Sequence, residues 1–221
     1  MKRDLYSGIL LIAGALAGVL VMSFHPTARD MMAGADVARQ AYLGVLVHAV
    51  ALATVPVLFL GLLGLSRRLG PSDLTTAALV FYGFGGVAVI SAAVASGFVA
   101  TPVIRWLVAG QGEGGSPEVY HALLGYTSLW NQGFAKVSTV AVAVAILLWS
   151  AAIWRSGPTL PRMPRAAGVF GAIVGAGVLI GVLSGHLRLD VHGFAIVTLA
   201  QSAWLLWLGV VMCRKGSGVA P

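Results

Sequence analysis

Long apolar stretches, separated by short groups of polar and basic residues, dominate the pattern along the chain. They cover residues 5–24, 42–65, 74–100, 132–154, 166–185 and 194–212. A helix needs about 20 apolar residues to cross the roughly 30 Å hydrocarbon core of a bilayer, and each stretch is long enough. The pattern therefore predicts an all-α polytopic membrane protein, a six-transmembrane-helix bundle that forms a single membrane domain over residues 1–221.

The first stretch has one property of a secretory signal peptide, because Lys2 and Arg3 precede it. Its apolar part is longer than the roughly 7–15 residues of a signal-peptide core, and no small-residue cleavage motif follows. We therefore interpret it as a retained transmembrane helix.

The segment before the fourth stretch contains a further helix start, Ser116-Pro117-Glu118. Serine is a good N-cap and proline suits the first helical turn. One helix from Pro117 to Trp154 would be about 57 Å long, which is too long for a single straight span. We therefore predict a separate interfacial helix over 117–130 on the outer side, with a break at Gly125 or at 131–133.

Composition excludes two large classes of protein. Only 10% of the residues are charged and 58% are hydrophobic, whereas soluble domains carry about 25% charged residues. The chain is therefore neither a soluble enzyme nor a disordered protein. Its net charge of +7 does not indicate a nucleic-acid partner, because the basic residues stand singly or in pairs at the ends of apolar stretches. The partner we expect is the lipid bilayer.

The basic residues also predict the orientation. Six crossings place both termini on one side with Lys2, Arg3, Arg67, Arg68, Arg155, Arg162, Arg165, Arg214 and Lys215, and leave Arg29, Arg39, Arg105 and Arg188 on the other. The positive-inside rule assigns the more basic side to the cytoplasm. Arginine exceeds lysine and Ala, Gly and Val abound, which suits a GC-rich bacterium. We expect a multi-pass protein of the bacterial inner membrane, with both termini cytoplasmic.

All five histidines fall on the outer side of this topology. Helix rise places four of them at one height, about 28–33 Å above the cytoplasmic basic residues; these are His25, His48, His186 and His192. His121 lies in the outer connection and would fold over that level. For each histidine, the alternative is an ordinary interfacial residue, and His25 also suits a cation that caps the end of a helix.

Other polar residues share this level. Lys136 has the same depth as His48, Asn131 and Gln132 lie about one turn above it, and Gln201 lies deeper. Ionisable side chains inside spans usually face an interior, a cavity or each other. A facing His48 and Lys136 would need one neutral partner or a carboxylate between them. We therefore select Lys136 and Asp30 as candidate catalytic residues.

The most distinctive local motif covers residues 185–193, where polar and apolar residues alternate: Gly-His-Leu-Arg-Leu-Asp-Val-His-Gly. It presents two imidazoles and one carboxylate, which Zn²⁺, Cu²⁺ and Fe²⁺ accept as ligands. The alternative is a solvated turn with an Arg188–Asp190 ion pair. We predict a transition-metal site (Zn, Cu or Fe) built from His25, His48, His186, Asp190 and His192.

Haem b is the other cofactor that this level suggests, with His48 as one axial ligand and His186 or His121 as the second. The glycines of 166–185 would let a macrocycle approach the backbone. Their alternative role is close helix packing, because Gly171 and Gly175 form a small-xxx-small pattern.

These observations lead to one main functional hypothesis and two alternatives. The main one is a periplasmic-face metal or haem site that performs redox or metal-assisted chemistry on a membrane-borne or lipid substrate. The first alternative is a non-catalytic accessory or scaffold subunit, in a homo-oligomer or with a partner membrane subunit. The second is a small transporter with His48, Lys136 and Gln201 along its path.

Overall fold

The computed structural model describes residues 2–27, 36–109, 115–156 and 163–214, and this part of the chain is helical without strands. The helices are α1 (Lys2–Ser23), α3 (Val37–Leu69), α4 (Asp73–Ala93), the π-helix η1 (Val94–Ala100), α5 (Thr101–Ala109), α6 (Pro117–Arg155), α7 (Arg165–Leu183) and α8 (Val191–Cys213). Six helices are long and apolar enough to span a membrane, since α4, η1 and α5 form one continuous rod. The predicted six-helix membrane bundle is confirmed.

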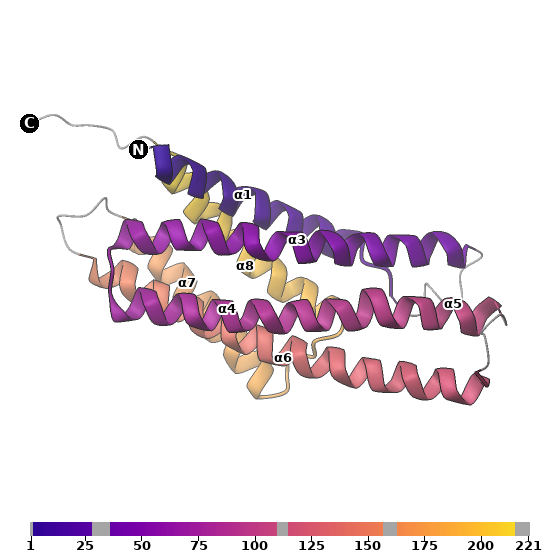
Figure 1. Cartoon of the computed structure of the whole chain (residues 1–221). Coiled ribbons are helices and arrows are strands. Elements are labelled where there is room, and N and C mark those ends of the chain that lie inside the picture. The colour runs from indigo at the N-terminus through magenta and orange to yellow at the C-terminus, as the bar shows by residue number, and fades with distance from the viewer. Residues whose placement is uncertain (1, 28–35, 110–114, 157–162, 215–221) are drawn as a thin grey trace, which may run out of the picture.

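The six spans run side by side (Figure 1), and the contacts between neighbours close them into a ring. α1 packs between α3 and α8, and α6 packs between α4 and α7. α3 also contacts α4, and α7 contacts α8. The bundle thus has two layers, one made of α3, α1 and α8 and the other of α4, α6 and α7.

The first and last helices meet at one end of the bundle. Cys213 Sγ lies 3.8 Å from the carbonyl oxygen of Leu5, and Arg68 Nη1 lies 3.8 Å from Asp4 Oδ2. α3 and α6 end and α7 begins on this same side (Figure 1), and Arg67, Arg155 and Arg165 lie at those helix ends, so we call it the basic end. That this end faces the cytoplasm stays a prediction.

The spans differ in length, and the difference appears at the end opposite the basic end (Figure 1). α3, the α4–η1–α5 rod over Asp73–Val108, and α6 have 33, 36 and 39 residues, whereas α1, α7 and α8 have 22, 19 and 23. At 1.5 Å per residue the long helices reach about 50–58 Å and the short ones about 29–35 Å. The long helices therefore continue past the ends of the short ones by roughly 20 Å.

The predicted break in α6 is wrong, because one helix runs from Pro117 to Arg155. Gly125 and Gly133 have no neighbouring atoms within 4 Å that a side chain would meet, so nothing forces a bend there. The amides of Asn131 and Gln132 donate to the carbonyl oxygens of Ala92 and Leu189, both at 3.0 Å. These side chains tie α6 to its neighbours instead of competing with its own backbone.

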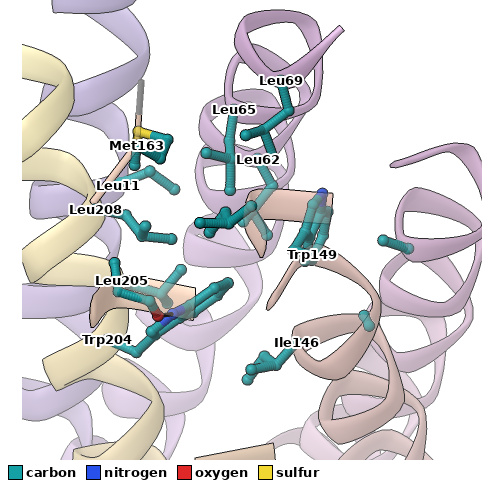
Figure 2. Packing of buried hydrophobic residues seen from close by; sticks show 14 of the residues in the cluster. Leu11, Leu62, Leu65, Leu69, Ile146, Trp149, Met163, Trp204, Leu205 and Leu208 are labelled. Carbon is teal, nitrogen blue, oxygen red and sulfur yellow. Dashed lines mark hydrogen bonds between the residues drawn. The ribbon is translucent and has the colours of Figure 1, made fainter. Parts of the chain in front are cut away.

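The largest hydrophobic cluster lies toward the basic end and joins both layers (Figure 2). Its most deeply buried members include Leu11, Leu62, Trp149, Trp204 and Leu208. Each tryptophan also makes a hydrogen bond, since Trp149 Nε1 donates to Ser66 Oγ at 2.9 Å and Trp204 Nε1 donates to the carbonyl of Ala167 at 3.0 Å. The cluster leaves no polar group of these rings unpaired.

Glycines let two pairs of helices approach closely. A Cβ atom on Gly8 of α1 would lie 2.7 Å from the carbonyl oxygen of Gly209 in α8, and one on Gly209 would lie 2.8 Å from that of Gly8. Gly175 of α7 faces α6 in the same way, because a Cβ atom there would lie 2.9 Å from the carbonyl oxygen of Ala143, and Gly171 makes room for the side chains of Ser150 in α6 and Trp204 in α8. The packing interpretation of Gly171 and Gly175 is therefore confirmed.

Candidate functional site

Of the predicted site residues, the structure brings His25 and His48 into contact. His25 lies two residues beyond the end of α1, and His48 lies in the first half of α3, where it is buried. Their Nε2 atoms are 3.3 Å apart, and the ring centroids are 4.8 Å apart at an interplanar angle of 67°. Two imidazoles from separate spans thus point their Nε2 atoms at each other.

Backbone carbonyls determine the tautomer of both rings. His48 Nδ1 lies 2.6 Å from the carbonyl oxygen of Gly44, and His25 Nδ1 lies 2.9 Å from that of Pro26. A carbonyl oxygen only accepts, so both Nδ1 atoms carry the proton and donate. In the neutral rings both Nε2 atoms therefore present lone pairs to each other. This arrangement is repulsive unless a proton or a metal ion lies between them.

The separation of the two nitrogens suits a shared metal ion. Two imidazole nitrogens that bind one tetrahedral Zn²⁺ at about 2.0–2.1 Å are about 3.3–3.4 Å apart. Histidines that bind metals usually donate their other ring N–H to a carbonyl or carboxylate, which fixes the ring. Burial also lowers the pKa of His25 from its ordinary value, which favours the neutral ligand form.

A wider helical turn makes room for the His48 ring. Gly97 lies in η1, and a Cβ atom there would be 2.5 Å from His48 Cγ and 2.9 Å from its Nδ1. Thr101 Oγ1 donates to the carbonyl oxygen of Ser96 at 3.3 Å inside this region. π-helical turns are rare and often mark functional sites. Sequence reasoning missed η1, for which the only signal is a glycine inside an apolar stretch.

A cavity of about 140 Å³ adjoins the histidine pair. Its walls come from α1, α3, the α4–η1 rod, α6 and the start of α8, and its polar lining residues are His25, His48, Ser96, Asn131, Gln132 and Asp190. The amide nitrogens of Asn131 and Gln132 each donate one hydrogen bond to backbone, so their oxygens and their second N–H groups are the atoms available to a ligand. Asp190 caps α8, with Oδ1 accepting from the Gly193 N–H at 2.8 Å.

Apart from Asp190, which lines the same cavity, the other predicted site residues lie away from this pair. His186 is exposed and its Nδ1 lies 2.8 Å from Ser184 Oγ. His192, His121 and Lys136 are also exposed. Asp30 lies outside the described residues. Within the described residues, no three His, Cys, Asp or Glu side chains are close enough to hold a metal ion, so the five-residue metal site is not assembled.

There is a physical reason why each of these predicted residues lies away from the histidine pair. In the 185–193 motif, polar and apolar residues alternate, so the Leu189 side chain is buried and those of His186 and Arg188 are exposed. The alternation therefore packs an apolar residue against the bundle and leaves its polar neighbours in solvent. His121 does not fold over the site, because α6 is straight and its rise puts His121 about 15 Å from Asn131 along the helix. Lys136 faces away from the interior, which removes one predicted member of the transporter path.

The geometry does not suit haem. Axial nitrogens on opposite sides of an iron are about 4 Å apart at ordinary metal–nitrogen distances, with the macrocycle between them. His25 and His48 face each other at 3.3 Å instead, and the 140 Å³ cavity is smaller than the roughly 300–1,000 Å³ typical of drug-sized ligands. His121 and His186, the partners predicted for His48, are on the exterior.

Comparison of the chain with protein-family models, with curated protein sequences and with solved structures finds no match.

Proposed function

We propose that this chain is a bacterial inner-membrane protein that binds one transition-metal ion between His25 and His48 at its periplasmic face. The observation that carries the proposal is the pair of facing Nε2 lone pairs, 3.3 Å apart, with each Nδ1 held by a backbone carbonyl. A cation between these atoms converts the repulsion into two coordinate bonds. Zinc and copper suit imidazole nitrogen best among the predicted metals.

The proposed ion would have only two protein nitrogens from the described residues, so it would keep open coordination positions. Asn131, Gln132 and Asp190 also line the cavity that adjoins the pair, where their oxygen atoms could meet a bound water or substrate. Open positions allow a metal to activate a bound water or a substrate oxygen. Redox or metal-assisted chemistry on a membrane-borne substrate is therefore the activity class that we propose for this site.

The basic end supports the proposed orientation. Arginines gather where α3 and α6 end and α7 begins, and the histidine pair lies roughly 30 Å away along the helices. By the positive-inside rule, the pair then faces the periplasm.

Metal binding by the purified chain tests the proposal. After chelator treatment in detergent, titration with Zn²⁺ and with Cu²⁺ is expected to give one tightly bound ion per chain in a calorimeter, with imidazole nitrogen ligands in the X-ray absorption spectrum. A variant with His121, His186 and His192 all replaced by Ala is expected to bind equally well. Absence of stoichiometric binding, or its loss in this triple variant, would contradict the proposal.

Gly97→Ala probes the space that η1 leaves for His48. The added Cβ atom would overlap the ring, so the ring must move, and we expect ion affinity to fall about 10–100-fold, as for loss of a supporting residue at a metal site. Gly83→Ala in α4 is the matched control, because the nearest atom to its Cβ would be Phe59 Cε2 at 3.8 Å. Equal ion affinity in the two variants would show that η1 does not position His48.

A further inference from the structure

A second cavity lies directly beside the histidine-lined one and extends toward the basic end. It has a volume of about 160 Å³, and it reaches Leu62, Trp149 and Trp204 of the main hydrophobic cluster. The residues that line both cavities are Val21, Met22, Ala51, Val89 and Phe194. The two spaces therefore adjoin along shared walls, and both have mainly apolar linings, with the polar residues of the first gathered around the histidine pair.

The deeper cavity has an unused hydrogen-bond donor. Gln201 of α8 lines it, and its Nε2 atom is buried with no hydrogen-bond partner among the described residues. A buried donor without a partner costs about 1–3 kcal/mol. A ligand that places an acceptor oxygen beside Gln201 would remove this cost. Tyr82, Trp149 and Trp204 supply aromatic walls around the same space.

The dimensions of the two cavities limit the size of the ligand that they can hold. An engineered protein cavity of about 150 Å³ binds one benzene molecule, so each of the two spaces has the size of about one six-membered ring. Gln201 lies 13 residues before Arg214, and His48 lies 19 residues before Arg67, so the two side chains differ in height by about 9 Å. A ligand that reaches both must cover roughly that distance together with its hydrogen bond to Gln201 and its contact at the histidine pair, so it needs an acceptor at each end and an apolar body between.

We propose that the two cavities together bind one membrane-borne ring molecule with carbonyl oxygens at opposite ends, of which para-quinones are the chemical type. One oxygen accepts a hydrogen bond from Gln201, and the other faces the site between His25 and His48. The ring fills the apolar space between them. The inference rests on the proposed function only at the outer end, where the bound ion has an open position for the second oxygen.

Quenching of tryptophan fluorescence tests the inference, because Trp149 and Trp204 line the deeper cavity. The probe is duroquinone, and durene is the matched compound without carbonyls. We expect saturable quenching by duroquinone and binding of durene that is at least about fivefold weaker. Gln201→Leu is expected to weaken duroquinone binding about fivefold and to leave durene unaffected. Equal binding of both compounds by the unmodified chain would overturn the inference.

A pair of glycine variants locates the binding. Gly18 lines the deeper cavity, and a Cβ atom there would meet Thr198 Cγ2 at an ordinary 3.5 Å, so Gly18→Leu places a side chain in the space without a backbone clash. We expect it to abolish saturable quenching, whereas Gly177→Leu, which meets nothing within 4 Å, keeps it. If Gly18→Leu does not fold, Ala51→Leu from the opposite wall replaces it. Retained quenching in a folded, filled variant overturns the inference.

The titration is run with metal-free and metal-loaded protein, and metal stoichiometry is measured separately. Loss of duroquinone binding in Gly18→Leu with unchanged metal stoichiometry supports the inference independently of the metal. Metal binding by the unmodified chain without saturable quenching overturns the inference and leaves the proposed function intact. Quenching without metal binding overturns the proposed function and retains the ligand site.

Discussion

Replacing His48 with alanine is expected to weaken binding of Zn²⁺ or Cu²⁺ by more than about 100-fold, because loss of a ligand must exceed the roughly 10–100-fold cost of losing a supporting residue. His25 alone would leave the ion with one protein nitrogen from the described residues. The cost arises at the ion and not in the fold, since His48 contacts Gly97 and His25 rather than the main hydrophobic cluster. Calorimetric titration measures the affinity, and thermal unfolding verifies that the variant is folded.

The two histidines are expected to act as one unit. His25→Ala should lower the affinity as much as His48→Ala, and the double variant should lose little more, because either single change already destroys the bidentate arrangement. His121→Ala is the matched control, since that ring is exposed on α6. If the losses of ion affinity in the two single variants added up in the double variant, the rings would bind separate ions, and the shared site would be refuted.

Gly209→Leu is expected to cause the largest loss of stability. The backbones of α1 and α8 touch at Gly8 and Gly209, and a Cβ atom on Gly209 would also lie 2.7 Å from Ile12 Cγ1. A leucine must therefore separate the two helices. Overpacking of this kind costs about 3 kcal/mol, which corresponds to a fall in Tm of about 6–12 °C for a chain of this size. Circular dichroism during heating in detergent measures the change.

Gly177→Leu is the control for this substitution, because α7 leaves that position open. We expect its Tm to stay within about 2 °C of the unmodified chain, in keeping with the small effects of surface substitutions. Similar Tm values for the two leucine variants would show that the α1–α8 contact adds little to stability.

The six spans were predictable because they depend on local composition alone. Each apolar stretch had to cross the bilayer as a helix, and its ends were marked by basic residues such as Arg67 and Arg155. The continuation of α6 through Gly125 was not predictable, because it depends on neighbouring helices. The ring of Tyr120 packs on that of Trp106 in α5 with the centroids 6.2 Å apart, and the Asn131 amide donates a hydrogen bond to α4. A single sequence does not reveal which distant helix supplies such partners.

The candidate site was predictable in height but not in rotation. Helix rise gives the depth of His48 from its distance to Arg67, and it placed His25 and His48 correctly at one level. It says nothing about which way a side chain points around the helix axis. This direction decides the position of Lys136, whose side chain is exposed. Spans that are apolar on all sides give no sequence signal for the inward face, so the exposure of Lys136 was not predictable. Asp190 has the right height and a place on the cavity wall.

The unequal span lengths give the outer end of the bundle a stepped profile. His25 and Asp190 stand where α1 ends and α8 begins, whereas α3, the rod and α6 continue past them. The proposed metal site therefore has a low rim on the side of α1 and α8 and a high wall on the side of α3, the rod and α6. A hydrated ion approaching from the aqueous phase would arrive over the low rim. A molecule bulky enough to rest against the high wall would be held above the proposed site.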